Sequence, residues 1–449
     1  MSLLEPLCVA LLGMNAGSPA VTGRAYPPPQ KVEERTIEKE ILVDLHARVR
    51  VQHSYGLLRV LPSEPSIPPH AVLKVRTTGE SGGGGSFLDS VRLEVTSGAD
   101  GTLLVRSSFP EAERKPKGLS FLAEMELWLP PKTPLEVENR YGPIEVSGWK
   151  TQVGAENRLG PIRISDHQGP LKLTSRFDQV DLSRVEGDIV VSASSATVGI
   201  SQCKGSLRVL NSFGEVRCDR CEGEVHIENR NQPVTLTNLR GNAALIVPCC
   251  EVNATRVTGD LQIEGSNAPI VAEKIGGDLT IRHKYGNVTV RDVAGKADVL
   301  GHLTPVAIDN VHGPVEIQCT SSSVSATRLS KGLKLLTTSG AVLIEDVDGE
   351  VDAATRAGLM VFRWSGSSAS SPAAVRLENH QSPIEIELAE SCGAELLLTS
   401  IGACIESELP GLSVEQSGNS RVGRLVVGNG KNRIEATSNG GAIVVRKRR

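Results

Sequence analysis

Cysteines are the residues whose type and spacing come closest to a chemical site in this sequence. Cys218 and Cys221 form a single C-x-x-C pair. Two thiolates at this spacing make half of a structural zinc site, and a second pair would be needed to complete it. We therefore set a metal-site hypothesis for Cys218 and Cys221 against the simpler interpretation, which we favour, that both are small apolar residues of a core. No cofactor is expected.

Carboxylates suggest two further kinds of site, and the sequence argues against both. Calcium-binding nonapeptide repeats read G-G-x-G-x-D-x-h-x, where h is apolar. The second glycine and the internal aspartate are missing here, so we interpret Asp188, Asp260 and Asp278 as turn residues. Enzymes that cleave glycosidic bonds need two carboxylates close together. One outward-facing series, spaced by 18 residues, has no acidic residues at successive positions: Glu145, Arg163, Asp181, Gly199, Arg217, Thr235 and Asn253.

Charge and hydropathy exclude other classes of protein. Lys and Arg number 48 and Asp and Glu 52, which gives a net charge of −4, so no overall basic field attracts nucleic acid, and we expect no nucleic-acid partner. Because no apolar stretch reaches 18 residues, we expect no membrane-spanning segment. The nine cysteines are an odd number spread through a long chain and do not resemble a disulfide framework.

A nine-residue repeat positions these side chains. From Thr133 the chain reads G-x-h-x-h-x-x-x-x in 26 consecutive units, with both h positions apolar in every unit and the first position Gly in 16. Gly142 to Val146 and Gly277 to Ile281 are examples. The segment h-x-h is a short strand of period two, and the glycine marks a corner of the backbone.

Alternate units differ, which raises the true period to 18 residues. Every second unit carries a third, mostly apolar position: Trp149, His167, Val185, Cys203, Cys221, Leu239, Val257, Ile275, Val293, Val311, Leu329 and Val347. Such short strands bury their apolar faces only by stacking on similar strands. We therefore predict an all-β fold, a single-stranded parallel β-helix (β-solenoid) of 13 coils over residues 133–366, roughly 60 Å long at ~4.8 Å per coil.

The other units give this solenoid a polar edge and a mixed one. Their equivalent of the third position is often polar, as in Arg158, Arg176, Ser194, Ser212, Arg230, Lys284 and Arg356. A second row at 18-residue spacing is mixed in character: Tyr141, Leu159, Phe177, Ser195, Phe213, Asn231, Cys249, Asn267, Tyr285 and Leu303.

The repeat also places two of the candidate chemical residues. Cys203 lies 18 residues before Cys221, so the two thiols should meet on adjacent coils about 5 Å apart. We predict a possible disulfide between Cys203 and Cys221 if the chain is exported; peptide mapping without reductant that finds both thiols free would rule it out. His167 falls on the apolar third position, and we interpret it as a structural histidine.

The flanks of the repeat divide the chain further. Residues 1–35 are expected to be a leader, either a signal segment or disordered. Residues 36–132 are expected to form an N-terminal β region and cap, with a flexible Gly-rich insert at 79–86 and a hairpin from Val91 to Val105. Residues 367–449 are expected to form degenerate coils and a C-terminal cap, and the basic tail Arg446 to Arg449 to be a charged end that opposes stacking.

These patterns resemble one known family. The corner from Tyr55 to Val60, the stretch from Leu135 to Val146 and the later G-D-h-x-h units are similar to the DUF4097 or "putative adhesin" family of bacterial β-strand-repeat proteins. The resemblance spans residues 36–445 and implies a fold, but no catalytic motif. It also implies export to the cell envelope or the exterior, whereas the poor export signal here leaves a cytoplasmic location as the alternative.

We therefore expect a protein that is not an enzyme. The leading prediction is a β-solenoid scaffold or adhesin-like interaction protein of the bacterial envelope, monomeric or weakly self-associating, with an unknown protein or surface polymer as its partner. The alternatives are a cytoplasmic, bactofilin-like self-assembling scaffold and a carbohydrate-active solenoid enzyme, which the missing carboxylate pair disfavours.

Overall fold

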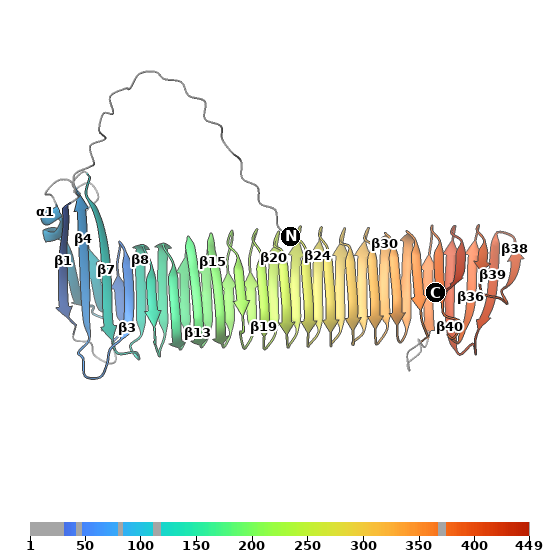
Figure 1. Cartoon of the computed structure of the whole chain (residues 1–449), viewed down its shortest axis with the longest axis horizontal. Coiled ribbons are helices and arrows are strands. Elements are labelled where there is room, and N and C mark those ends of the chain that lie inside the picture. Colours follow the sequence, from blue (N-terminus) through green and yellow to red (C-terminus); the bar gives the residue numbers. More distant parts are fainter. Residues whose placement is uncertain (1–30, 42–46, 80–83, 111–117, 367–373, 449) are drawn as a thin grey trace, which may run out of the picture.

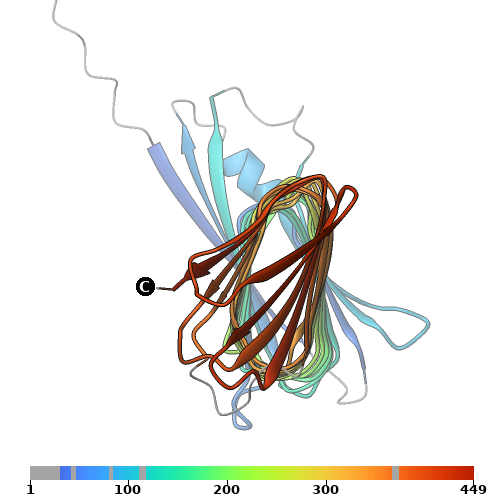
Figure 2. The same cartoon turned by 90° about the vertical axis from the view of Figure 1, so that its right-hand side faces the viewer.

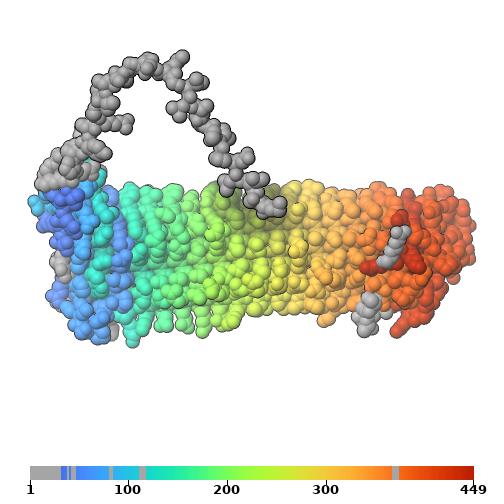
Figure 3. Space-filling model, in the orientation of Figure 1, coloured from blue at the N-terminus to red at the C-terminus, as the bar shows by residue number. Residues whose placement is uncertain are grey.

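Two long β-sheets face each other in a flattened rod (Figures 1 and 2). The computed structural model describes residues 31–41, 47–79, 84–110, 118–366 and 374–448, so most of the predicted leader lies outside the described residues. Each regular coil contributes one strand to each sheet, which we call sheet A and sheet B. The space-filling view shows a rod whose width changes little along its length (Figure 3).

The predicted 18-residue coil is confirmed residue by residue. In sheet B, Val153 pairs with Leu171 in parallel register, and in sheet A, Ile162 pairs with Val180. The strands of sheet B in the 13 regular coils are β8 (Leu135–Tyr141), β10 (Val153–Leu159), β12 (Leu171–Ser175), β14 (Ile189–Ala193), β16 (Leu207–Leu210), β18 (Val225–Glu228), β20 (Ala243–Pro248), β22 (Leu261–Ser266), β24 (Leu279–Lys284), β26 (Ala297–His302), β28 (Val315–Thr320), β30 (Leu333–Ser339) and β32 (Val351–Ala357).

The strands of sheet A alternate with these along the chain. They are β9 (Ile144–Ser147), β11 (Ile162–Gln168), β13 (Asp178–Glu186), β15 (Ala196–Lys204), β17 (Val216–Asp219), β19 (Val234–Leu239), β21 (Val252–Val257), β23 (Ile270–Ile275), β25 (Val288–Val293), β27 (Val306–Val311), β29 (Val324–Leu329), β31 (Val342–Val347) and β33 (Met360–Trp364). The apolar positions of both sheets point inward and are buried, as at Val153 and Ile162. The core is therefore a set of stacked aliphatic rows between the sheets.

Glycines at the corners are required by the close approach of successive coils. Gly160 has φ 139°, and a Cβ on it would lie 2.3 Å from the carbonyl oxygen of Gly142 one coil away. Gly187 has φ 143° and would place a Cβ 2.2 Å from the carbonyl oxygen of Gly169. Only glycine accommodates both the backbone conformation and the contact.

The N-terminal end contains a coil that is stacked out of sequence order. Strands β2 (Val49–Gln52) and β3 (Leu57–Pro62) pair with β8 and β9 on one side. On the other side they pair with β6 (Leu103–Ser108) and β7 (Ser120–Leu129). The coil of β2 and β3 is thus held between segments that follow it in the chain (Figure 1).

Antiparallel strands finish this end. In sheet A, β7 pairs with β4 (His70–Gly79), which pairs with β1 (Lys31–Glu40). In sheet B, β6 pairs with β5 (Arg92–Ser97), which confirms the predicted hairpin. Residues 31–35, expected in the leader, instead begin β1.

The expected flexible insert at residues 79–86 needs correction. Gly79 ends β4, and residues 84–86 begin helix α1 (Gly84–Ser90). Phe87 and Leu88 of this helix are buried, and the Phe87 ring lies 4.9 Å from that of Phe121. Burial of these two side chains gives the glycine-rich segment a packed structure that its composition does not indicate.

The C-terminal end repeats the out-of-order arrangement. The coil of β34 (Ala374–Asn379) and β35 (Ile384–Leu388) stacks on β32 and β33. Next in space comes the last coil of the chain, β40 (Asn432–Asn439) and β41 (Ile443–Lys447), and beyond it the earlier β36 (Ala394–Ile401) and β37 (Ile405–Ser407). Antiparallel β39 (Ser420–Val427) and β38 (Ser413–Ser417) close sheet B.

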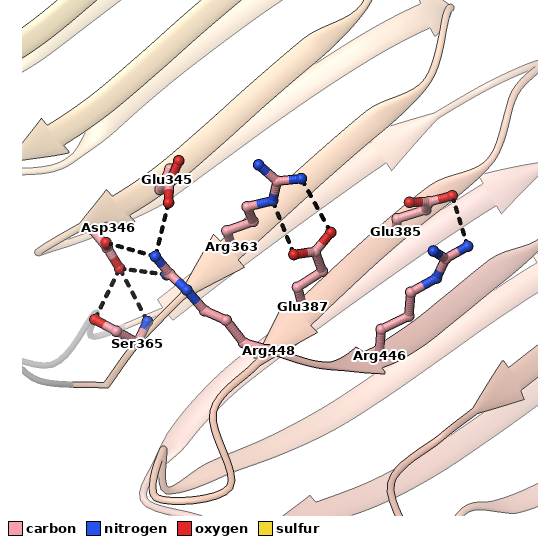
Figure 4. A network of polar contacts seen from close by, with 8 residues as sticks. All are labelled: Glu345, Asp346, Arg363, Ser365, Glu385, Glu387, Arg446 and Arg448. Carbon is pink, nitrogen blue, oxygen red and sulfur yellow. Dashed lines mark hydrogen bonds and ion pairs between the residues drawn. The ribbon is translucent and has the colours of Figure 1, made fainter.

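The basic tail does not form the expected charged end. Because β41 lies between β35 and β37, the tail runs along the outer side of sheet A (Figure 4). Arg448 forms ion pairs of 2.8 Å with Glu345 and Asp346, and its side chain is only 21% exposed. Arg446 lies 3.4 Å from Glu385. These arginines therefore join the last strand to neighbouring coils.

Candidate functional site

The three clustered cysteines occupy core positions. Cys203, Cys218 and Cys221 are all buried, with free thiols. Contact with Cys221 and burial raise the pKa of the Cys203 thiol. The hydrogen bond with Cys203 lowers the pKa of Cys221, but contact with Cys218 and burial outweigh it and raise the pKa to about 12. The thiols are therefore held in the protonated, weakly nucleophilic form.

The two hypotheses for these cysteines have different outcomes. Over the described parts of the chain, no group of three or more His, Cys, Asp or Glu side chains is placed to hold a metal ion, so the pairing of Cys218 with Cys221 has no completing ligands there. Cys203 and Cys221 do lie on adjacent coils, since Glu222 donates a backbone hydrogen bond of 2.8 Å to the carbonyl of Cys203. Their disulfide stays a prediction.

The other residues singled out from the sequence have structural contacts. The carboxylates of Asp260 and Asp278 accept backbone N–H groups of the next coil at 2.8 Å, as expected for turn residues. Asp188 accepts from Ser206 at 2.6 Å in the same way. His167 is fully buried, and its Nε2 lies 3.0 Å from the carbonyl oxygen of Gly169. Burial lowers the pKa of His167, so the ring is neutral.

A groove runs along the outer side of sheet B. It consists of three hollows of about 540, 570 and 850 Å³. The first and second share Arg176, and the second and third share Ile246 and Pro248. The hollows extend from Arg106 on β6 to Thr320 on β28, roughly 60 Å at ~4.8 Å per strand. We call this feature the sheet B groove.

Three arginines on successive coils line the first hollow. Arg140, Arg158 and Arg176 follow one another at 18-residue spacing, and the register of β8, β10 and β12 places them side by side. All three are exposed. Within the described residues, none of them has a carboxylate within ion-pairing distance. We call these three residues the arginine row.

The opposite edge of the coil shows that unpaired arginines are not a general property of this solenoid. Arg184 on that edge makes two hydrogen bonds, of 2.6 and 2.8 Å, to Asp166 one coil away. Arg328 pairs in the same manner with Asp309, and this contact lowers the pKa of the aspartate. Arginines on that edge are thus neutralised by neighbouring coils, whereas the arginine row is not.

A row of apolar side chains follows the arginine row at the adjacent corner. Tyr55 stacks on Tyr141 with ring centroids 5.2 Å apart, and Phe109 meets Tyr55 edge-on at 5.4 Å. Further along, the row contains six side chains that are between 42% and 64% exposed: Tyr141, Leu159, Phe177, Phe213, Tyr285 and Leu303. We call the row from Phe109 to Leu303 the apolar edge. Six of the 13 aromatic residues of the chain lie on it.

Part of the apolar edge adopts a backbone conformation that L-residues avoid. Phe213 has φ 64° and Tyr285 has φ 61°. The left-handed region costs a bulky residue about 1–2 kcal/mol, whereas asparagine adopts it more readily. Asn231 and Asn267 occupy the same row with the same conformation. Large exposed rings at Phe213 and Tyr285 are therefore not what stability alone selects.

A carboxylate pair that the sequence interpretation missed also lies in this groove. Glu138 and Glu156 are paired in register on β8 and β10, whereas the outward series inspected in the sequence belongs to sheet A. Glu138 is held by Arg50 and by Gln52, whose amide donates at 2.9 Å, and Glu156 is exposed. Neither lies in the apolar enclosure in which glycosidases hold their protonated acid. The alternation of Glu138 and Glu156 at 18-residue spacing is the signal that identifies them.

Comparisons with known proteins leave the chain without a family assignment. No family model and no curated protein matches the sequence. A solved structure described as a "putative cell adhesion protein from Clostridium sporogenes ATCC 15579" is 9% identical with a TM-score of 0.19, over 93% of this chain and 100% of that chain. A similarity of this size carries no argument about function, and membership of the DUF4097 family stays a prediction.

One further observation concerns membranes. Within the described residues, no helix has the length and apolar content that crossing a bilayer requires.

Proposed function

We propose that this protein is a non-catalytic, adhesin-like binding rod of the bacterial envelope or exterior, which holds an extended partner in the sheet B groove. The observation that carries the proposal is the continuity of the groove, whose three hollows share lining residues over 13 neighbouring strands. A long open groove suits a polymer or an extended segment, which makes many small contacts. A small substrate is typically enclosed instead.

The ends of the rod favour a monomer over a self-assembling scaffold. Open polymerisation of a solenoid requires end coils that accept a further coil in register. Here each end is finished by antiparallel strands, and seven of the ten residues of edge strand β1 are charged. Charged edge strands oppose the addition of another strand. We expect sedimentation velocity to show a monomer, with at most weak association at high concentration.

The pair of Glu138 and Glu156 keeps a carbohydrate-active enzyme as the second candidate. Carboxylates on adjacent parallel strands lie at a separation compatible with a retaining glycosidase. The two functions predict different products from the same ligand, because an enzyme shortens the polymer that it binds.

The test is a panel of purified polymers incubated with the full chain: polygalacturonate, teichoic acid, dextran and chitosan. We measure binding by co-sedimentation or interferometry, and cleavage by new reducing ends and polymer size. The proposal predicts that at least one polymer is bound and that its size is unchanged. Cleavage by the wild type and not by E138Q/E156Q would establish the enzyme instead, and absence of binding to every polymer would contradict the binding rod.

A further inference from the structure

The arginine row is a set of three unneutralised cations at regular spacing. Arg140, Arg158 and Arg176 lie on successive strands, about 4.8 Å apart along the rod. Like charges at this separation repel each other, and a solenoid removes such repulsion by placing carboxylates on the next coil, as it does at Arg184 and Asp166. The arginine row lacks this compensation within the described residues, so it is arranged for an anionic ligand.

The rest of the first hollow indicates that the ligand is not a densely charged polyanion. Glu138 and Glu156 line the same hollow, together with Gln52, Ser54 and Ser107. Carboxylates repel a phosphate backbone, but they accept hydrogen bonds from hydroxyl groups. A ligand that fits this lining carries both anionic groups and hydroxyls.

The apolar edge adds the third requirement. Tyr141, Leu159 and Phe177 each follow one arginine of the row directly in the chain and are between 42% and 48% exposed. Each coil therefore presents one cation beside one apolar side chain. Exposed rings stack against flat, weakly polar faces, and the C–H face of a pyranose ring is such a surface.

We propose that the sheet B groove binds an acidic polysaccharide, with uronate carboxylates on the arginine row and sugar faces on Tyr141, Leu159 and Phe177. This inference rests on the proposed binding function and specifies its ligand class. Arginine matches a carboxylate with two parallel hydrogen bonds. A pyranose unit advances an extended glycan by about the rise of one coil. Phosphates in a nucleic-acid strand recur at about 3.4 Å in a duplex, which does not match the coil spacing.

The experiment compares variants of the full chain in titration calorimetry with a fully de-esterified oligogalacturonate. The variant R140Q/R158Q/R176Q removes the arginine row, and R217Q/R256Q/R291Q removes the same charge from exposed sites of sheet A and the opposite edge. We expect binding by the wild type, at least tenfold weaker binding by the first variant, and unchanged binding by the second, because only the first loses bidentate contacts. The methyl ester of the same oligomer should bind at least tenfold more weakly than the acid. F177A should weaken binding several-fold without altering the unfolding temperature by more than ~2 °C.

Three results overturn the inference. The first is absence of oligogalacturonate binding; if another polymer of the panel is then bound, only the ligand class fails and the binding rod stands. The second is an equal loss in both triple variants, which shows attraction by overall charge. The third is tighter binding of a single-stranded oligonucleotide of equal charge with the same loss in R140Q/R158Q/R176Q, which assigns the row to nucleic acid. Cleavage of the oligomer contradicts the proposed function but leaves the ligand class intact.

Discussion

At the scale of single residues, the two edges of the coil differ in what their side chains accomplish. On the polar edge, Asp166 and Arg184 neutralise each other between coils. On the sheet B side, Arg158 and Leu159 face solvent without such partners within the described chain. An unpaired cation beside an exposed apolar side chain contributes little to stability. Residues of this kind are retained for contact with another molecule.

Phe213 offers a direct check of this interpretation. Its ring is 64% exposed and its backbone has φ 64°, so replacing it with Asn, as at Asn231 in the same row, removes strain and loses little buried area. We expect Phe213→Asn to leave the free energy of unfolding unchanged or to raise it by about 0.5–1 kcal/mol, measured by urea denaturation.

The control for this variant is Phe362→Asn, at a fully buried core position. It should destabilise the protein by about 3–5 kcal/mol, because a buried aromatic side chain is lost and a polar one is left in its place. Destabilisation by more than 1 kcal/mol in Phe213→Asn would show that the exposed ring has a structural role, contrary to its assignment to the apolar edge.

At the scale of strands and coils, how far the sequence predicts the structure depends on whether the signal is local. Phase and register over residues 133–366 follow from rows such as Val153 and Leu171, because each coil contacts its sequence neighbours. The stacking of β2 on β8 joins Val49 to Leu135 across 86 residues, and no local pattern specifies such a partner. The same holds for β41, whose position overturned the expected role of the basic tail.

The groove was only partly predictable for a related reason. The polar position of Arg158 and Arg176 and the mixed row of Tyr141 and Leu159 are visible in the sequence. Their adjacency on one open groove depends on the direction of side chains at a corner. That direction is set by backbone conformations such as the positive φ of Phe213, which the residue type does not predict. Glu138 and Glu156 escaped notice because the series inspected lies on the other sheet.

The position of β41 leads to a prediction for the C-terminal end. Truncation after Gly441 removes the buried Ile443 and Val445 and leaves β35 and β37 without their shared partner. The loss of two buried aliphatic side chains costs about 3 kcal/mol or more. We expect hydrogen exchange to become fast in residues 394–427 while the central coils remain protected, because each coil contacts only its neighbours.

Truncation after Lys447 is the matched control. It retains β41 and removes Arg448 with its ion pairs to Glu345 and Asp346. A partly exposed ion-pair network contributes about 1 kcal/mol, so protection in residues 394–427 should decrease only slightly. Equal effects of the two truncations would show that the tail acts through its charges and not as a strand held within the stack.

At the scale of the whole molecule, the protein is a rod with two finished ends and unlike sides. The ends are closed by antiparallel strands, and the sheet B groove runs along the side between them. Such a shape provides one long binding face and discourages growth into a filament. Aliphatic residues fill the narrow core, so that aromatic residues are few and six of 13 lie on one exposed row.

Hydroxyl-radical footprinting of the chain, with and without the polymer that binds it, tests this assignment of the binding face most directly. The groove predicts protection at exposed side chains of sheet B and its apolar edge, including Tyr141, Leu159 and Phe177. It also predicts unchanged oxidation on the outer side of sheet A, for example at Leu343 and Val361. Protection confined to sheet A or to either end of the rod would contradict the sheet B groove as the functional face.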